Sequence, residues 1–272
     1  ETGISAKALG NLTQVSRLLD EVLNKAPNRY QAYVGQSAFT HKGGLHVSAV
    51  QKDPRTYEHV EPSLVGNKRV IPVSGQAGRS NLLAQFKDMG IEIDPKDPKV
   101  DRLLEEVKER EFRGYSYDGA LASFELMARR RLRQVPDYFD VESFRVQVER
   151  RHNAKGELIS VSDAVVKVVV DGKRYMSVAE GNGPVNSLDT ALRKDLGKYS
   201  DYLNDLRLVD FKVRILTTGT EAVTRVSIES TDDSGRRWFT IGVSPNIVDA
   251  SFAALIDSIT YKLMRDGAPA GT

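Results

Sequence analysis

The side chains of this sequence best suited to acid–base or metal chemistry are its four histidines, His41, His46, His59 and His152. An imidazole titrates near neutral pH and is a common metal ligand. His41 and His46 are five positions apart, however, and this spacing does not place them on one face of a helix. The sequence also has no His-x-His pair. A metal site is therefore not expected, and residue type alone favours a capping or hydrogen-bonding role for a lone histidine such as His46.

A glycine-rich turn, Gly-Asn-Gly-Pro at 181–184, precedes an expected helix. Backbone amides at the start of a helix bind anions. This turn lacks the lysine and the spacing of a phosphate-binding loop. A turn that leads into a helix is the simpler interpretation.

The strongest basic cluster is Ala-Arg-Arg-Arg-Leu-Arg at 128–133. It falls at the C-terminal end of an expected helix, where cations complement the helix dipole. No aromatic residues are interleaved with these arginines, and the net charge of the chain is only +2. Binding of nucleic acid is therefore not expected.

Composition is that of an ordinary globular protein, with 40% hydrophobic and 28% charged residues in a chain of 272. This length suits two or three compact units, since single domains usually have ~100–200 residues. No apolar run approaches the ~20 residues of a spanning helix, and the first residues do not resemble a secretory signal. The absence of cysteine excludes disulfides and fits a reducing compartment. We expect a cytoplasmic protein that does not bind membranes.

Helical spacing of apolar residues dominates the chain before Pro136. The clearest pattern predicts one amphipathic helix from Ser5 to Asn24. Shorter helices are expected over 80–89, 100–110 and 119–133. Because a residue before proline is pushed out of the helical region, Val135–Pro136 is the expected main domain boundary.

After Pro136 the apolar residues alternate, which predicts strands. The expected order is three strands followed by a helix, and the next stretch repeats it. Phe144–Val148 matches Phe211–Ile215, Asp163–Val168 matches Glu221–Val226, Gly172–Val178 matches Gly235–Ile241, and Val185–Leu192 matches Val248–Leu255. Two βββα repeats, at 137–200 and 205–268, predict an α+β domain with internal pseudo-symmetry.

Four segments of the first half resemble the linker region of the 2-isopropylmalate and citramalate synthases. They are Ser-Ala-Phe-Thr-His-Lys-Gly-Gly-Leu-His-Val-Ser-Ala-Val at 37–50, Thr-Tyr-Glu-His-Val-Glu-Pro-Ser-Leu-Val-Gly-Asn at 56–67, Ser-Gly-Gln-Ala-Gly-Arg-Ser-Asn at 74–81 and Gly-Tyr-Ser-Tyr-Asp-Gly-Ala-Leu-Ala-Ser-Phe-Glu-Leu at 114–126. The repeat at 137–268 resembles the C-terminal regulatory domain of the same family. The resemblance implies linker subdomains at 1–50 and 51–136. The sequences of the first two segments are closest to the citramalate branch of the family.

Members of this family join an acyl-CoA to a 2-keto acid by a Claisen-type condensation in a TIM barrel that holds a divalent cation. A barrel needs ~250 residues of βα units, so the resemblance implies that this chain is a segment without the barrel, inactive alone and without a cofactor of its own. It would serve an acetyl-CoA-dependent citramalate synthase that uses pyruvate in isoleucine biosynthesis. Two alternatives stay open: the same segment of a 2-isopropylmalate synthase that senses leucine, and a stand-alone amino-acid-binding or dimerisation module.

The resemblance also assigns site residues. His46 matches the histidine that assists acid–base steps in the partner subunit's active site, which reverses the interpretation from residue type alone. A branched-chain amino acid, isoleucine ahead of leucine, would bind near the dimer axis of a homodimer formed through 137–268. The effector-binding residues implied by position are Val185, Asn186, Leu208, Phe211, Ile215 and Ala222. The alternation of Phe211 and Ile215 is equally explained by a place in the core.

Overall fold

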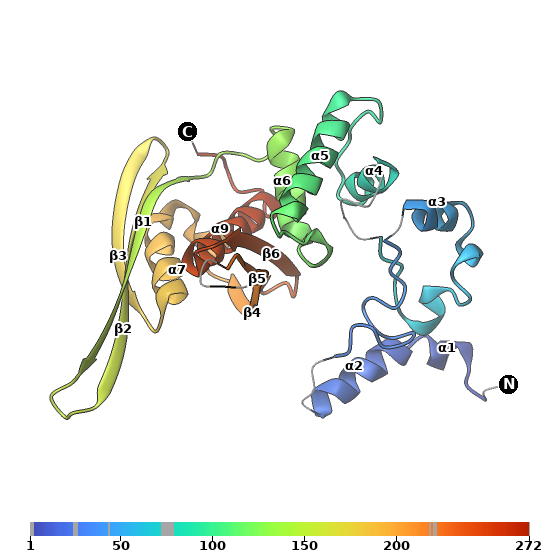
Figure 1. Ribbon diagram of the computed structural model, residues 1–272, viewed down its shortest axis with the longest axis horizontal. Helices are drawn as coiled ribbons and strands as arrows, with labels where there is room; N and C mark the ends of the chain where they lie inside the picture. Colours follow the sequence, from blue (N-terminus) through green and yellow to red (C-terminus); the bar gives the residue numbers. More distant parts are fainter. Residues whose placement is uncertain are drawn as a thin grey trace. The chain divides into compact units, whose positions relative to one another are not determined.

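The computed structural model describes residues 3–23, 27–42, 44–71, 79–217, 219 and 222–271. These divide into two compact units, Glu1–Glu109 and Arg110–Thr272 (Figure 1). The first contains helices and loops, and the second combines helices with two antiparallel sheets, so the chain belongs to the α+β class. None of the described helices has the length and apolar character needed to cross a bilayer.

The first unit is built from short helices. Their bounds are α1 Ala6–Leu9, α2 Leu12–Val22, α3 Gly44–Lys52, η1 Pro54–Thr56, η2 Pro62–Val65, α4 Arg79–Asp88 and α5 Pro98–Phe112, the last of which continues into the second unit. The prediction of one helix over 5–24 is wrong, because the chain turns at Gly10 and Asn11 between α1 and α2. Glycine weakens a helix interior by about 1 kcal/mol relative to alanine, which favours a break there. Most of the predicted motif at 74–81 lies outside the described residues.

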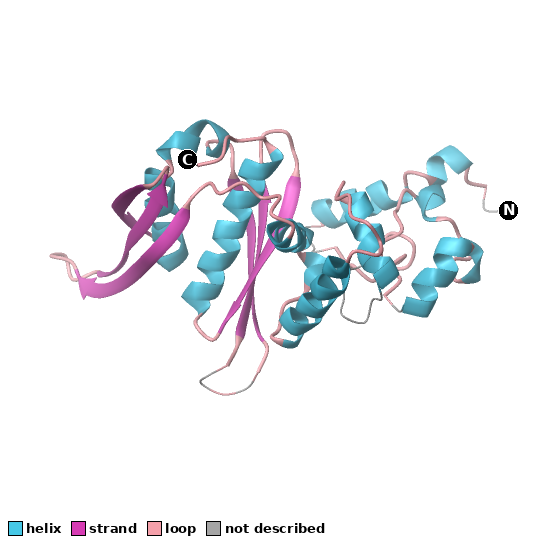
Figure 2. Cartoon of the chain, turned by 90° about the horizontal axis from the view of Figure 1, so that it is seen from above, coloured by secondary structure: helices cyan, strands magenta, loops and turns pink. Residues whose placement is uncertain are grey.

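The second unit holds both sheets (Figure 2). Its elements are η3 Tyr117–Gly119, α6 Leu121–Arg131, β1 Asp140–His152, β2 Leu158–Val170, β3 Lys173–Gly181, α7 Pro184–Asp195, η4 Gly197–Tyr199, α8 Ser200–Leu203, β4 Arg207–Ile215, β5 Thr224–Thr231, β6 Arg237–Ser244 and α9 Ile247–Arg265. One sheet has the order β1-β2-β3 and the other β4-β5-β6, all antiparallel. Each sheet is followed by a long helix, in the strand and helix order that the sequence predicts.

Helix α6 packs against α9 and β6, and thus against the second sheet. Glu125 of α6 is 3% exposed, accepts a hydrogen bond from the hydroxyl of Tyr261 at 3.1 Å, and pairs with Arg129 at 2.8 Å. The compact division accordingly falls at Arg110, whereas the sequence placed the main boundary at Pro136. The subdomain limits at 50 and 136 stay predictions.

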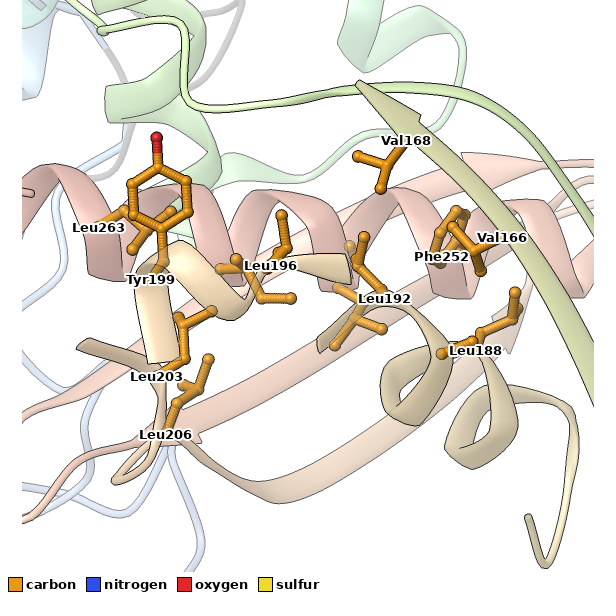
Figure 3. Packing of buried hydrophobic residues seen from close by; sticks show 14 of the residues in the cluster. Val166, Val168, Leu188, Leu192, Leu196, Tyr199, Leu203, Leu206, Phe252 and Leu263 are labelled. Atoms are coloured by element: carbon orange, nitrogen blue, oxygen red, sulfur yellow. The ribbon is translucent and has the colours of Figure 1, made fainter. Parts of the chain in front are cut away.

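A single hydrophobic core joins the two sheets (Figure 3). Leu188 and Leu192 of α7 and Leu196 at its C-terminal end lie in this core with Phe252 and Leu263 of α9, and all five are at most 2% exposed. The strands add alternate residues of β2 and β5: Val166, Val168, Val226 and Ile228. Each fully buried side chain of this size contributes about 1.5–3 kcal/mol. The two βββα units therefore stabilise each other.

Candidate functional site

His46 lies in the first turns of α3, with an exposed side chain. Its ring stacks on that of Tyr57, with 4.2 Å between centroids and 29° between planes. Tyr57 follows η1, so the loop after α3 brings it back over the helix. The stacking holds the imidazole in place while its ring nitrogens remain accessible to another molecule.

His41 belongs to a partly buried ionic cluster centred on Glu58. The carboxylate of Glu58, 7% exposed, accepts hydrogen bonds from Arg69 Nε at 2.7 Å and Nη2 at 2.6 Å, and lies 2.9 Å from His41 Nε2. The hydrogen bond from Arg69 lowers the pKa of Glu58, and His41 adds to this effect against the opposing effect of burial. Because an ionised carboxylate only accepts hydrogen bonds, Nε2 of His41 carries the donated hydrogen. His41 is thus held as a structural partner.

The other two histidines each have a different environment. His59 lies 3.4 Å from the hydroxyl of Tyr33 through Nε2, and His152 ends β1 opposite Leu158. Across the described ranges, no cluster of three or more His, Asp or Glu side chains is arranged to hold a metal ion.

Val185 and Asn186 occupy the first turn of α7, after Gly183 as N-cap and Pro184 at the first helical position. Asn186 Oδ1 accepts a hydrogen bond from the amide of Asn182 at 3.1 Å. A Cβ atom on Gly181 would lie 2.6 Å from the amide nitrogen of Ser187, so the turn needs glycine there for the helix to approach the strand.

Leu208, Phe211 and Ile215 share one face of β4, since they pair with Ser230, Ile228 and Thr224 of β5, which are all buried. This face of the edge strand is incompletely covered: Leu208 is 45% exposed and Ile215 is 67% exposed. Ala222 lies beside the same strand end, because Leu216 donates a hydrogen bond to the carbonyl of Val223 at 2.8 Å.

The structure therefore groups the four residues near β4, and places Val185 and Asn186 on a helix that packs on β2 and β3. Within the described part of the chain, no hydrogen bond or ring contact joins the two groups.

A cavity of about 730 Å³ lies elsewhere in this unit, between β1 and the first turns of α9. Its apolar wall is formed by Val141, Phe144, Val146, Val248, Phe252 and Ile256. The rings of Phe144 and Phe252 meet edge to face at 4.6 Å. Asn246, Asp249 and Arg145 add polar groups to the lining. Sequence reasoning missed this cavity, although the repeat matches Phe144 to Phe211 and Val248 to Val185.

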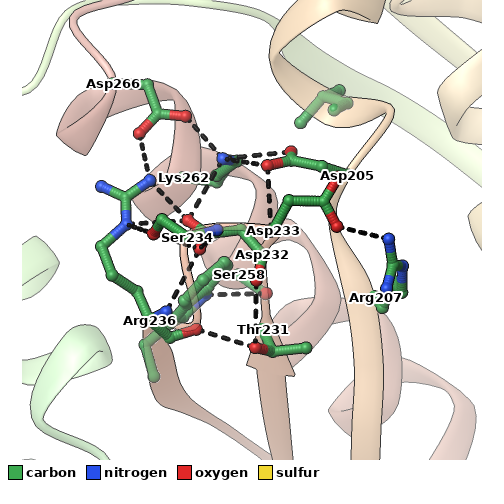
Figure 4. Close-up of polar contacts among 12 residues, drawn as sticks. Asp205, Arg207, Thr231, Asp232, Asp233, Ser234, Arg236, Ser258, Lys262 and Asp266 are labelled. Atoms are coloured by element: carbon green, nitrogen blue, oxygen red, sulfur yellow. Dashed lines mark hydrogen bonds and ion pairs between the residues drawn. The ribbon is translucent and has the colours of Figure 1, made fainter.

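An ionic network lies at the end of the second sheet where β4 begins and where a turn joins β5 to β6 (Figure 4). The ammonium group of Lys262, 4% exposed, lies 3.3 Å from Asp232, 2.6 Å from Asp266 and 3.1 Å from Asp205. Arg236 also pairs with Asp232 and Asp266. These groups join the chain before β4, the β5–β6 turn and the end of α9. Each charge in the network has a partner of opposite sign, so the network serves to stabilise the fold.

Two protein families match the chain. Residues 119–263, more than half of it, match the family described as "LeuA allosteric (dimerisation) domain". Residues 33–113 match "Homocitrate synthase post-HMGL domain-like".

Three similar relatives are each named (R)-citramalate synthase. The one from Aquifex aeolicus is 47% identical over 265 residues, covering 97% of this chain and 49% of the relative. The one from Geobacter sulfurreducens is 51% identical over 259 residues, covering 94% and 48%. The one from Synechocystis sp. is 45% identical over 262 residues, covering 96% and 48%. The chain spans about half the length of the curated relatives it matches.

Proposed function

Since the chain belongs to the LeuA allosteric (dimerisation) domain family, we propose that it is the linker and regulatory segment of an acetyl-CoA-dependent citramalate synthase. The whole enzyme condenses acetyl-CoA with pyruvate in the cytoplasm, as a step of isoleucine biosynthesis. The segment lowers this activity when isoleucine binds. The observation that carries the proposal is the 45–51% identity to (R)-citramalate synthases across nearly the full chain.

The condensation itself belongs to the part of the enzyme outside this chain. The relatives are about twice as long as the chain, which leaves room for a TIM barrel of ~250 residues and its divalent cation. The segment alone is therefore inactive. Mixed with acetyl-CoA, pyruvate and magnesium, it should release no CoA above background, and release in proportion to the protein would contradict this part of the proposal.

His46 contributes to the condensation from this segment. Its exposed ring, stacked on Tyr57, suits a group that assists proton transfer in the active site of the partner subunit. Such a role requires a homodimer, for which the matched dimerisation family and the exposed apolar face of β4 are the support.

Regulation requires that isoleucine bind one state of the enzyme more tightly than the other, because equal affinity for both states would shift nothing. The β4 face with Leu208, Phe211 and Ile215, together with Ala222 and the start of α7, supplies aliphatic side chains suited to this ligand. We infer that the two βββα units are an internal repeat. The effector would bind between them, near the dimer axis.

Calorimetry of the chain with isoleucine, leucine and valine tests the proposal. Isoleucine should bind most tightly, but by a modest factor, since pocket shape alone discriminates such isomers by only ~1–3 kcal/mol. Binding should also raise the melting temperature with increasing ligand concentration. If none of the three binds at millimolar concentration, the sensing function is wrong.

A further inference from the structure

We propose that the cavity between β1 and α9 is a second binding site for an aliphatic amino acid. This inference rests on the proposed function for the class of ligand. The cavity is a binding position that the sequence did not indicate.

The two halves of the domain match each other in sequence and in the position of a β-bulge. Strand β1 has a β-bulge between Val141 and Ser143, and β4 has one between Leu208 and Asp210, each 67 positions later. The same offset relates Val141 to Leu208 and Phe144 to Phe211. On the helices, an offset of 63 relates Val248 to Val185 and Asp249 to Asn186.

Four of the six residues proposed for the effector near α7 and β4 thus have counterparts that line the cavity: Val141, Phe144, Val248 and Asp249. The cavity is where a site of the same design would lie in the other half. This hollow is open to solvent on one side, but it has walls from two elements, β1 and α9.

The lining of the cavity has the chemistry that such a ligand needs. An aliphatic amino acid needs an apolar wall for its side chain and opposite charges for its ammonium and carboxylate groups. Phe144, Val146 and Ile256 contribute to the wall, and about 730 Å³ lies within the usual size of small-molecule sites. Asp249 supplies a negative charge for the ammonium group, and the start of α9, at Ile247 after the N-cap Asn246, supplies the positive end of a helix dipole for the carboxylate. These two groups can hold the two charges of a zwitterion.

Helix α9 both lines the cavity and packs against α6. Ile256 lines the cavity. Its neighbour Asp257 accepts a hydrogen bond from Ser123 at 2.8 Å and pairs with Arg130 at 2.7 Å, both on α6. A ligand that contacts α9 is thus one helix away from α6, and it regulates the enzyme only if it binds one arrangement of these helices more tightly than another.

The test is the number of isoleucine molecules bound per chain, measured by calorimetry on the chain and on two matched variants. Ala253→Leu fills the cavity from an exposed position on α9, so it leaves the core intact. Thr190→Leu is the corresponding change on α7, 63 positions earlier. Asp249→Asn removes the proposed ammonium partner without changing the size of the side chain.

We expect the unmodified chain to bind two isoleucine molecules and the Ala253→Leu variant to bind one. Asp249→Asn should weaken the affinity of one of the two sites by roughly tenfold or more. The Thr190→Leu variant should also bind one isoleucine molecule. The double variant Thr190→Leu/Ala253→Leu should bind none. If Ala253→Leu leaves the stoichiometry and affinity unchanged while Thr190→Leu abolishes binding, the cavity site is overturned and the proposed effector site stands. Absence of binding to the unmodified chain overturns the proposed function together with this site.

Discussion

The hydroxyl oxygen of Ser123 lies 2.8 Å from Oδ2 of Asp257, although the two residues are 134 positions apart. The same oxygen accepts a hydrogen bond from the amide of Ile241 at 3.0 Å. One buried hydroxyl therefore joins α6, β6 and α9. This contact ties the helix preceding the sheets to the helix that ends the domain.

Ser123→Ala should destabilise the fold by about 1–3 kcal/mol, because it leaves the buried amide of Ile241 without a partner. Urea denaturation measures the effect as a lower midpoint. Ser160→Ala, on an exposed position of β2, is the control and should change the midpoint little. Equal midpoints for the two variants would show that the hydroxyl does not stabilise the junction.

Lys262→Met should destabilise the fold more strongly, by about 3–5 kcal/mol, because removing one partner of a buried network leaves uncompensated charge. The lysine is 4% exposed and Asp232 is fully buried. The control is Arg207→Gln, which breaks the pair of Arg207 with Asp233, both about two-thirds exposed. Exposed pairs contribute little, so thermal and urea unfolding of this control should match the unmodified chain.

Stability should fall in acid because of Asp232. Burial raises the pKa of this carboxyl, but hydrogen bonds from Ser234, Arg236 and Lys262 together outweigh burial and hold the pKa well below its usual range. An unfolded aspartate has a pKa of about 3.9. The ionised carboxylate therefore stabilises the fold above that pH, and the contribution is lost as the pH falls toward the folded pKa.

We expect the free energy of unfolding to decrease between about pH 5 and pH 2, and to decrease less in Asp232→Asn, which is already weaker at neutral pH. The slope should not vanish in the variant, because hydrogen bonds from Lys262 and Arg236 also lower the pKa of Asp266 against the effect of burial. Parallel curves for the two proteins would exclude a role of Asp232 in acid unfolding.

The sequence predicts the strands and their order well, since alternation along β1, β2 and β5 is a local signal that survives folding. The prediction fails at Gly10, where the helical spacing of apolar residues continues through a turn. The spacing shows which residues are apolar, but it does not show whether the helix is continuous. Helix α3 was also missed. Its residues around Gly44 and His46 show no clear period.

The candidate site was harder to predict, because it depends on contacts between distant segments. The ionic network joins Asp205, Asp232 and Lys262, which no local pattern relates. The cavity likewise needs β1 and α9 to meet across the domain. The repeat was the one signal that could have suggested it, through the match of Phe144 with Phe211.

Gly242→Ala should separate α9 from β6. A Cβ atom at this position would collide with the carbonyl oxygen of Ala250, whose backbone cannot move without shifting the helix. Overpacking of this kind typically costs about 1–3 kcal/mol. Gly197→Ala is the matched control, because nothing lies within 4 Å of the added atom. A melting temperature of Gly242→Ala equal to that of Gly197→Ala would mean that the helix tolerates the shift.

His46→Gln should reduce turnover of the whole synthase while leaving effector binding intact. If the imidazole assists proton transfer, its loss should lower kcat by about 10²–10⁴-fold, with the larger change in kcat than in KM. His59→Gln is the control: His59 lies 3.4 Å from the Tyr33 hydroxyl and has no proposed role in the reaction, so turnover should stay within a few-fold. CoA release measures the rates, and calorimetry with isoleucine shows whether the regulatory part is undisturbed. Tyr57→Leu separates positioning from chemistry, because it removes the ring on which His46 stacks but keeps the imidazole; it should lower kcat by less than His46→Gln does. Unchanged turnover in His46→Gln would return this histidine to a purely structural role and would remove the main reason to expect that the linker of one subunit reaches the active site of its partner.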